Sequence, residues 1–173
     1  MFKKFWVSKV VPTALVTIWR VLENKLATKA NLIRRGITIS SSTCSLCGVK
    51  EETSTHLIFE CRFVWLLWNH YCVWMGVQGV FHNVPLLNFS QFRMNNALIS
   101  MDKVWGGIWI AVVNEVSRHK NRVIFKGGVI DVLEAFALVQ LKTSSWVSSK
   151  SQSAFFSFSD WCIDPIVCIR MIL

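Results

Sequence analysis

The segment from Cys44 to Cys61 constrains the fold most, because it contains four side chains of the types that bind zinc. Cys44, Cys47, His56 and Cys61 follow the spacing C-x2-C-x8-H-x4-C. Structural zinc sites take four thiolate or imidazole ligands in a tetrahedron without an open position. Two residues between the first cysteines allow a tight turn with both sulfur atoms on one side, and Gly48 can adopt the positive φ that favours such a turn. The spacing therefore predicts one zinc ion.

The second half of the ligand set constrains the local backbone. His56 and Cys61 are five residues apart, which is about 140° of rotation on an α-helix and too wide for one face. We therefore expect a short helix around His56 that loosens or ends near Cys61. Three thiolates and a neutral imidazole make zinc a poor Lewis acid, so its role would be structural. The second ring nitrogen of His56 is expected to donate to a carbonyl or carboxylate, and Lys50, Glu51 and Glu52 at the loop tip are expected to be solvated.

Two other interpretations of the cysteine pattern remain open. A chance C-x-x-C beside a core histidine and a buried cysteine would need no metal, since free cysteine is often a small buried hydrophobe. A redox C-x-x-C would need a preceding strand and a following helix, and the sequence offers neither clearly. Four ligand-type residues in one short polar loop favour zinc over both interpretations.

The other cysteines, Cys72, Cys162 and Cys168, are expected to be buried or free. The chain has 6 cysteines, but a disulfide framework would require a secretory context. A second metal site that combines Cys72 with His70 or His82 fits no established ligand spacing. We therefore expect one structural zinc and no second metal site.

Apolar residues at helical spacing predict a helical hairpin before the cysteine loop. Pro12 and Thr13 suit the first turn of a helix. The apolar face of this helix is predicted to comprise Leu15, Ile18, Trp19, Leu22 and Leu26. A second short helix is predicted with Thr28 as its N-cap and Gly36 as its C′ residue.

The rest of the chain is predicted to be helical around one irregular segment. Residues 63–75 are apolar nearly all round, which predicts a helix buried on most sides that ends at Gly76. Residues 76–100 are expected to be irregular. Helices are predicted from Met101 to the break at 127–128 and over 129–146, the latter with a core side of Val132, Phe136, Val139 and Leu141. The fold class is therefore mainly α: a small helical zinc-binding domain (helix hairpin plus CCHC zinc loop) at 1–75, a linker at 76–100, a second helical segment at 101–146, and a Ser-rich, apolar tail at 147–173. The Ser-rich residues 144–159 are expected to be mobile.

The charge of the chain favours a polyanionic partner. The net charge is +9, from 19 Lys and Arg against 10 Asp and Glu, so nucleic acid is the first candidate and an anionic membrane the second. A first basic cluster near the zinc loop comprises Arg20, Lys25, Lys29, Arg34 and Arg35, and a second comprises Arg118, Lys120, Arg122 and Lys126. Such cations can hold a phosphate backbone or form a solvated helix face. The first cluster leaves both open, whereas the second favours the solvated face, because helix C-termini attract cations.

The aromatic content excludes a disordered chain and predicts a large core. The sequence has 9 Trp and 12 Phe among 173 residues, more expected in a core than as platforms for base stacking. Apolar residues 10–19 after a basic lead-in with Phe2, Phe5 and Trp6 superficially resemble a signal peptide, but Pro12 and Arg20 interrupt that pattern. No clean run of about 20 apolar residues exists. We therefore expect an intracellular protein without a membrane span, and such apolar content would suit a piece of a larger protein.

The order of helix hairpin, zinc ligands and tryptophans resembles a known family. That family is the reverse transcriptase zinc-binding domain, which follows the polymerase in plant non-LTR (LINE-type) retrotransposon polyproteins. The resemblance covers about residues 5–74 and rests on Val11-Pro12, Trp19-Arg20, Asn24, Leu26-Ala27-Thr28-Lys29, Asn31-Leu32, Arg34-Arg35-Gly36-Ile37, Cys44, Cys47-Gly48, Glu52-Thr53, His56-Leu57, Cys61, Trp65 and Trp68. The segment 108–125 looks like the tail found downstream in such proteins, with Ser117 and Lys120 in place of its usual Trp and Arg, as in a decaying copy.

The resemblance implies zinc at Cys44, Cys47, His56 and Cys61, descent from a retrotransposon polyprotein, and binding of RNA or DNA during target-primed reverse transcription. No catalysis is expected, because the chain has no Tyr-x-Asp-Asp polymerase sequence and two-metal chemistry needs converging carboxylates. The carboxylates in question are scattered over Asp102, Glu115, Asp131, Glu134, Asp160 and Asp164. Two alternatives stay open: a zinc-stabilised protein-interaction module that docks on a reverse transcriptase core, and a fragment of a degenerate element without function.

Overall fold

The computed structural model describes residues 12–78, 82–91, 99–149 and 156–172. Within these ranges the secondary structure is helical, and an isolated antiparallel bridge joins Thr43 and Glu51. The helices are α2 (Pro12–Leu22), α3 (Lys29–Arg34), the π-helix η1 (His56–Glu60), α4 (Arg62–Trp74), α5 (Pro85–Gln91), α6 (Ile99–Lys126), α7 (Val132–Ser148), α8 (Phe158–Ile163) and α9 (Pro165–Met171). The predicted mainly α fold class is confirmed.

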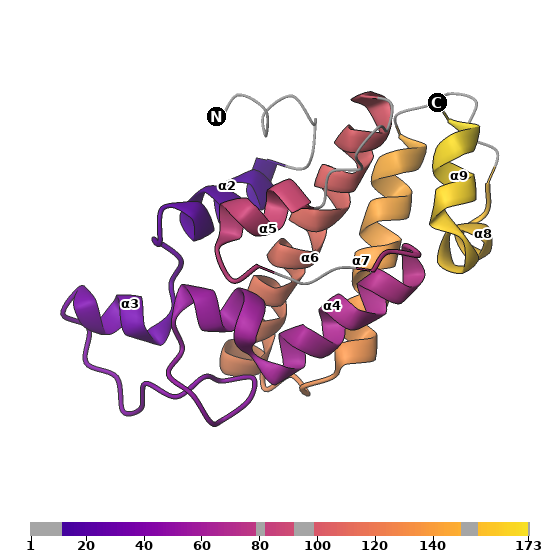
Figure 1. Ribbon diagram of the computed structural model, residues 1–173. Helices are drawn as coiled ribbons and strands as arrows, with labels where there is room; N and C mark the ends of the chain where they lie inside the picture. Colours follow the sequence, from indigo (N-terminus) through magenta and orange to yellow (C-terminus); the bar gives the residue numbers. More distant parts are fainter. Residues whose placement is uncertain (1–11, 79–81, 92–98, 150–155, 173) are drawn as a thin grey trace.

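Helix α6 organises the packing of the other helices. It runs through the middle of the molecule, with α2 and α5 on one side and α7 on the other (Figure 1). Helix α4 packs against α7 and against η1, and α8 packs on both α7 and α9. The zinc-loop region therefore rests, through η1 and α4, on the two long helices of the second half of the chain. The predicted division into domains stays a prediction.

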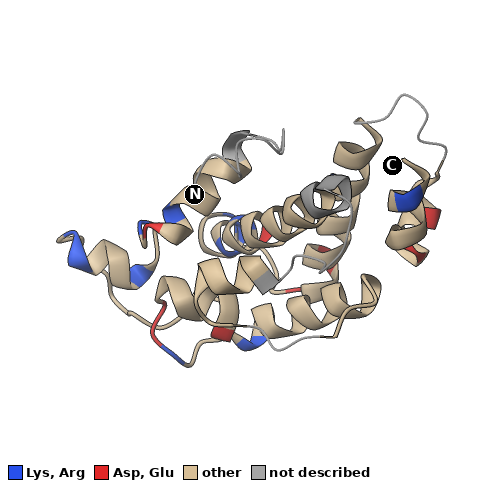
Figure 2. Ribbon diagram, turned by 45° about the horizontal axis from the view of Figure 1, so that its top comes forward, with Lys and Arg blue, Asp and Glu red and all other residues tan. Residues whose placement is uncertain are grey.

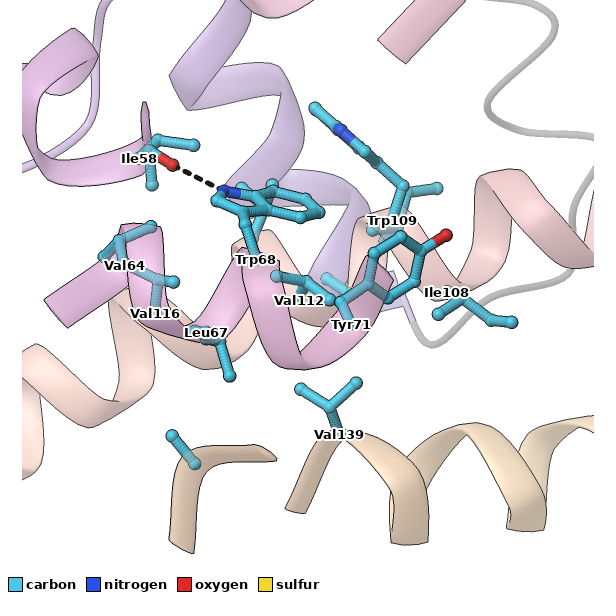
Figure 3. Packing of buried hydrophobic residues seen from close by; sticks show 14 of the residues in the cluster. Ile58, Val64, Leu67, Trp68, Tyr71, Ile108, Trp109, Val112, Val116 and Val139 are labelled. Atoms are coloured by element: carbon cyan, nitrogen blue, oxygen red, sulfur yellow. Dashed lines mark hydrogen bonds between the residues drawn. The ribbon is translucent and has the colours of Figure 1, made fainter. Parts of the chain in front are cut away.

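Helix α4 buries one face rather than most of its surface. Its buried residues are Phe63, Val64, Leu67, Trp68, Tyr71 and Trp74, which is the spacing of one side of a helix. Trp65, Leu66 and Val73 are exposed. The prediction of a helix buried on most sides was therefore wrong, because only the side toward α7, η1 and α6 has neighbours. The buried face meets Trp109, Val112 and Val116 of α6 and Val139 of α7 (Figure 3).

Large aromatic side chains form the centre of this core, and three of its tryptophans donate their indole N–H to a partner in the fold. The indole nitrogen of Trp68 donates to the Ile58 carbonyl at 2.9 Å (Figure 3). That of Trp74 donates to the Trp161 carbonyl at 2.9 Å, and that of Trp109 donates to Asn88 Oδ1 at 2.7 Å. Buried indoles need such partners, since an unpaired buried N–H carries a desolvation cost. The bonds of Trp74 and Trp109 join segments that are distant in sequence.

Several local predictions need correction. The segment 76–100 was expected to be irregular, but Pro85–Gln91 form α5 and α6 begins at Ile99. Leu141 was expected in the core and is exposed on α7. The expected mobile stretch at 144–159 begins inside α7, and its residues 150–155 lie outside the described part of the chain, as does the lead-in with Phe2, Phe5 and Trp6. None of the described helices combines the length and the apolar character needed to cross a membrane.

The crossing of α6 and α7 depends on a glycine. A Cβ atom built on Gly107 would overlap the ring of Trp146, whereas one built on the neighbouring Gly106 would lie 3.4 Å from Phe89. We expect Gly107→Ala to lower the free energy of unfolding by about 1–3 kcal/mol, as overpacked cores do. Gly106→Ala is the matched control, and its better helix propensity should raise stability by up to about 1 kcal/mol. Urea unfolding of both variants tests this, and two equal shifts would contradict it.

Candidate metal centre and basic surface

Cys44 and Cys47 lie in a tight turn that the backbone closes on both sides. The Cys44 N–H donates to the Lys50 carbonyl at 2.7 Å, and the Gly48 N–H donates to the Cys44 carbonyl at 2.8 Å. Gly48 has a φ of +68°, a region that glycine enters without the steric cost of a Cβ atom. The predicted role of Gly48 in the cysteine turn is confirmed.

His56 and Cys61 are brought together by a π-helical turn. His56 begins η1, and the Cys61 N–H donates to the His56 carbonyl at 2.8 Å. Such a hydrogen bond between residues five apart is characteristic of a π-helix. It closes a wider turn than the α-helix, so two residues five apart come to lie one above the other. The short helix expected around His56 is confirmed, and it ends at Cys61, whose backbone is extended.

The four side chains converge on one point. Their ligand atoms all lie within 4.8 Å of one another, with 3.9 Å between the Sγ atoms of Cys44 and Cys61 and 3.3 Å between Cys47 Sγ and His56 Nε2. A tetrahedron with Zn–S bonds of about 2.3 Å has edges of about 3.8 Å, whereas a disulfide would bring two sulfurs to about 2.05 Å. All six cysteines are free thiols. The geometry is consistent with one zinc ion.

The chemistry of the donor set also suits a cation. The contact between the Sγ atoms of Cys44 and Cys61 lowers the pKa of Cys44 to about 5, while the same contact and burial raise the pKa of Cys61. The contact therefore favours the thiolate form of Cys44. Zinc binding displaces thiol protons, because the thiolate is the ligand. Within the described residues, no other group of three or more potential ligands converges in this way.

The second nitrogen of His56 does not have the expected partner. Nδ1 is buried and has no hydrogen-bond partner among the described residues, so the predicted carbonyl or carboxylate is not there. His56 and Cys47 instead line a pocket of about 550 Å³, together with Leu46, Phe63, Leu66 and Ile130 among others. The backbone N–H of His56 donates to Thr53 Oγ1 at 3.0 Å, and its ring contacts Cys47 Sγ through Nε2.

A buried carboxylate, Glu52, ties the cysteine turn to two helices. Its side chain is fully buried and accepts from the backbone N–H of Lys29 at 3.2 Å and from that of Ser45 at 3.0 Å. Lys120 Nζ of α6 forms an ion pair with it at 3.4 Å and also donates to the Ala27 carbonyl at 2.6 Å. The prediction that Glu52 is solvated was wrong. No local signal indicated this burial, because Glu52 meets the N-terminus of α3, which favours negative charge, only in the folded chain.

A second polar tie runs from the zinc loop to the turn after α2. Asn31 is buried on α3, where the Thr28 side chain caps the helix as predicted. Asn31 Nδ2 donates to the carbonyls of Asn24 at 2.9 Å and Leu26 at 2.8 Å, and it contacts Ser54 Oγ at 3.2 Å. One amide therefore joins the helix, the preceding turn and the segment that leads into His56.

The first basic cluster lies on the surface. Arg20, Lys25, Arg34 and Arg35 are exposed, and Lys and Arg appear on α3 and at the end of α2 in Figure 2. Lys29 is half-buried, and its Nζ donates to the Thr43 carbonyl at 2.7 Å, so it is held against the zinc loop. The structure therefore places the five predicted residues around one edge of the molecule. Their role toward nucleic acid stays a prediction.

The second basic cluster is partly neutralised inside the fold. Lys120 is bound to Glu52, and Arg122 pairs with the buried Glu115 at 2.9 Å. Lys142 also pairs with Glu115. Of the four residues, only Arg118 and Lys126 are exposed. These ion pairs give Lys120 and Arg122 a structural role that the sequence did not reveal.

Acidic pH is expected to destabilise the fold through His119. Its ring is buried, stacks on Phe63 with centroids 4.8 Å apart, and accepts at Nδ1 from Arg122 at 2.9 Å. Burial, and then the Arg122 cation, lower the pKa of His119, although Glu134, Glu115 and Asp131 act in the opposite direction. The unfolded chain therefore binds the proton more tightly. Stability is complete above the ordinary pKa of about 6.5 and is lost as pH falls toward the lower folded value, by at most about 1.4 kcal/mol per pH unit.

The measurement is urea unfolding at about pH 7.5 and about pH 5.5 for the natural chain and for His119→Phe. Protonation of the zinc ligands weakens both proteins equally, so the difference between the two pH dependences isolates His119. The variant should lose less stability on acidification, and an equal loss in both proteins would contradict the role of His119.

The comparison with known proteins agrees with this site. Residues 1–68 match the model of a family described as zinc-binding in reverse transcriptase. All four residues of the metal cluster lie inside the matched segment. Searches of curated proteins and of solved structures gave no match. The match supports the resemblance at the level of the reverse transcriptase zinc-binding domain, and the plant and LINE-type origin stays a prediction.

Proposed function

We propose that this chain is a zinc-stabilised nucleic-acid-binding module, derived from a retrotransposon reverse transcriptase polyprotein and without catalysis of its own. One zinc ion would be held by Cys44, Cys47, His56 and Cys61, and it would be structural, since all four positions of the tetrahedron are taken by protein ligands. RNA or DNA would lie along Arg20, Lys25, Lys29, Arg34 and Arg35. A reverse transcriptase core from a longer polyprotein is a proposed further partner.

The observation that carries the proposal is that the zinc loop holds the basic edge in place. Glu52 joins the cysteine turn to the first residue of α3, and Asn31 joins α3 to the turn that carries Lys25. Lys25, Arg34 and Arg35 therefore sit on segments that are hydrogen-bonded to the metal-binding loop or to α3, and Arg20 lies near the end of α2 just before them. Cations on a rigid edge can position a phosphate backbone without reading its sequence.

The test combines zinc analysis with binding at several salt concentrations. The purified full chain should contain one zinc per molecule, and it should bind labelled RNA or DNA with an affinity that falls steeply with salt. A triple variant Arg20→Gln, Arg34→Gln, Arg35→Gln should lose affinity and reduce the salt slope by about the number of lost phosphate contacts. Arg170→Gln, an exposed cation on α9, is the matched control. A chain that binds neither RNA nor DNA would exclude the proposal.

A protein-interaction module is the second candidate, and the pocket beside the metal centre favours it. Val49, Leu66 and Ile130 line this pocket and are themselves exposed. An apolar side chain of a partner could occupy such a hollow. Self-association or binding to a reverse transcriptase core that is insensitive to salt, combined with no nucleic-acid binding, would favour this function.

A further inference from the structure

Trp19 is exposed where an apolar helix face would bury it. The spacing of α2 predicted that Trp19 faces the core with Leu15 and Ile18. Leu15 and Ile18 are buried, but Trp19 is 43% exposed. Ala14 and Val21 are buried as well, and α2 packs against α6. A large aromatic ring at the surface beside a basic cluster is a feature that the core does not explain.

The chain after α2 folds back and brings a cation over one face of this ring, which stays 43% exposed. Lys25 Nζ lies 4.9 Å from the centroid of the Trp19 ring, within the range of a cation–π interaction. Asn24 makes the reversal possible with a φ of +50°, a left-handed conformation that asparagine tolerates better than most residues. The Lys25 N–H then donates to the Arg20 carbonyl at 2.6 Å.

The reversed turn is held from the zinc-loop side. Asn31 Nδ2 donates to the Asn24 carbonyl at 2.9 Å, and Arg35 Nη2 donates to the Lys25 carbonyl at 2.9 Å. A local acid competes only weakly, because Glu23 lies 3.9 Å from Lys25 Nζ and both side chains are largely exposed. Lys25 is therefore held over the Trp19 ring, and the same segments carry two further exposed cations of the first basic cluster, Arg20 and Arg35.

We propose that Trp19 is a stacking platform for an unpaired base, so that this edge of the molecule binds single-stranded rather than double-stranded nucleic acid. The inference rests on the proposed function and names its substrate class. An indole ring can stack only on a base that is free of its own helical stack, and every base offers such a face. The surrounding cations take the phosphates on either side, as in other single-strand sites that combine aromatic rings with basic grooves.

Charge and shape together favour this occupant over a duplex or a protein. A duplex needs cations alone, because its bases are stacked on each other and its phosphates are what a basic surface meets. A purely apolar partner would leave the three cations without counter-charges. A flexible polyanion with exposed aromatic rings satisfies both the indole and the cations.

The experiment compares Trp19→Ala and Trp19→Phe with the natural full chain. Labelled oligo(U), oligo(dT) and a DNA duplex of equal length are titrated by fluorescence anisotropy at one fixed salt concentration. Trp19→Ala should weaken binding to both single strands by about 5-fold to 100-fold, the range of one base stacked on an aromatic ring. The duplex should bind the variant and the natural chain alike. Trp19→Phe, which keeps an aromatic face, should recover most of the single-strand affinity.

Trp65→Ala is the matched control, since Trp65 is 53% exposed on α4 and the substitution is the same. It should leave single-strand affinity unchanged. Zinc content and thermal unfolding of each variant show that the fold is intact. Unchanged single-strand affinity in Trp19→Ala would overturn the inference and leave the proposed function standing. A natural chain that binds no nucleic acid would overturn both.

Discussion

Cys44→Ser is expected to abolish stoichiometric zinc binding and to unfold the zinc loop together with the helices that depend on it. Metal binding in small zinc-finger peptides contributes about 10–16 kcal/mol at neutral pH, which is as large as the whole stability of a typical domain. Serine leaves three ligands and places a neutral hydroxyl in a buried position, since Cys44 is almost fully buried. The turn closed by Cys44 and Gly48 then has no metal to hold it.

Two measurements check this result: zinc per chain by elemental mass spectrometry, and helical content by circular dichroism. Cys44→Ser should show no bound zinc and a lower signal with a broadened or absent thermal transition. The control is Cys72→Ser, which makes the same change at a half-buried thiol of α4 outside the cluster. Its zinc content should stay at one per chain. If the Cys44→Ser protein unfolds as cooperatively as the natural one and at the same temperature, the metal does not stabilise this fold.

The second large effect is expected from Glu52→Ala. Glu52 is fully buried and joins the N-terminus of α3, the cysteine turn and Lys120 of α6. Removing one partner of a buried ion pair leaves an uncompensated charge and typically costs about 3–5 kcal/mol. Here the loss also leaves the N–H groups of Lys29 and Ser45 without their acceptor. We expect the free energy of unfolding to fall by about that amount.

The neighbouring Glu51→Ala provides a matched control, because Glu51 is exposed and surface substitutions usually change stability by less than about 0.5 kcal/mol. Urea unfolding of both variants gives the comparison. A Glu52→Ala, Lys120→Met double variant adds a further check. If Glu52 and Lys120 form a pair, the double variant should lose less stability than Glu52→Ala and Lys120→Met lose when their separate losses are added. Equal losses of unfolding free energy in Glu51→Ala and Glu52→Ala would show that the buried carboxylate contributes no more to stability than an exposed one.

The sequence allowed most of the local structure around the metal centre to be predicted, because the rules there are local. The C-x-x-C turn with Gly48, the capped start of α3 at Thr28 and the short helix at His56 each follow from the conformational preference of one or two residues. The structure adds the reason for the four-residue gap before Cys61. A π-turn, rather than an α-turn, places the two ligands together.

Tertiary contacts decided the parts that sequence analysis missed. An acid at a loop tip is normally solvated, and nothing local shows that Lys120, which lies on α6, reaches Glu52. Periodicity placed Trp19 on an apolar face, but the buried side of α2 carries Ala14, Leu15, Ile18 and Val21 and leaves the Trp19 ring exposed. For α4, composition suggested burial all round, whereas the number of neighbouring helices limits burial to one side. Each of these features depends on which segments meet, and a single sequence carries little information about that.

The position of α4 limits how the zinc module could be transplanted. The helix begins at Arg62, directly after the last cysteine of the cluster, and its buried face includes Val64, Leu67 and Tyr71, all with no exposed surface. That face is covered by α6 and α7, which come much later in the chain. A graft that ended near Gly76 would carry the metal ligands but present an uncovered apolar helix to water, and we expect it to aggregate. A portable version would need either the two later helices or a new polar face on α4.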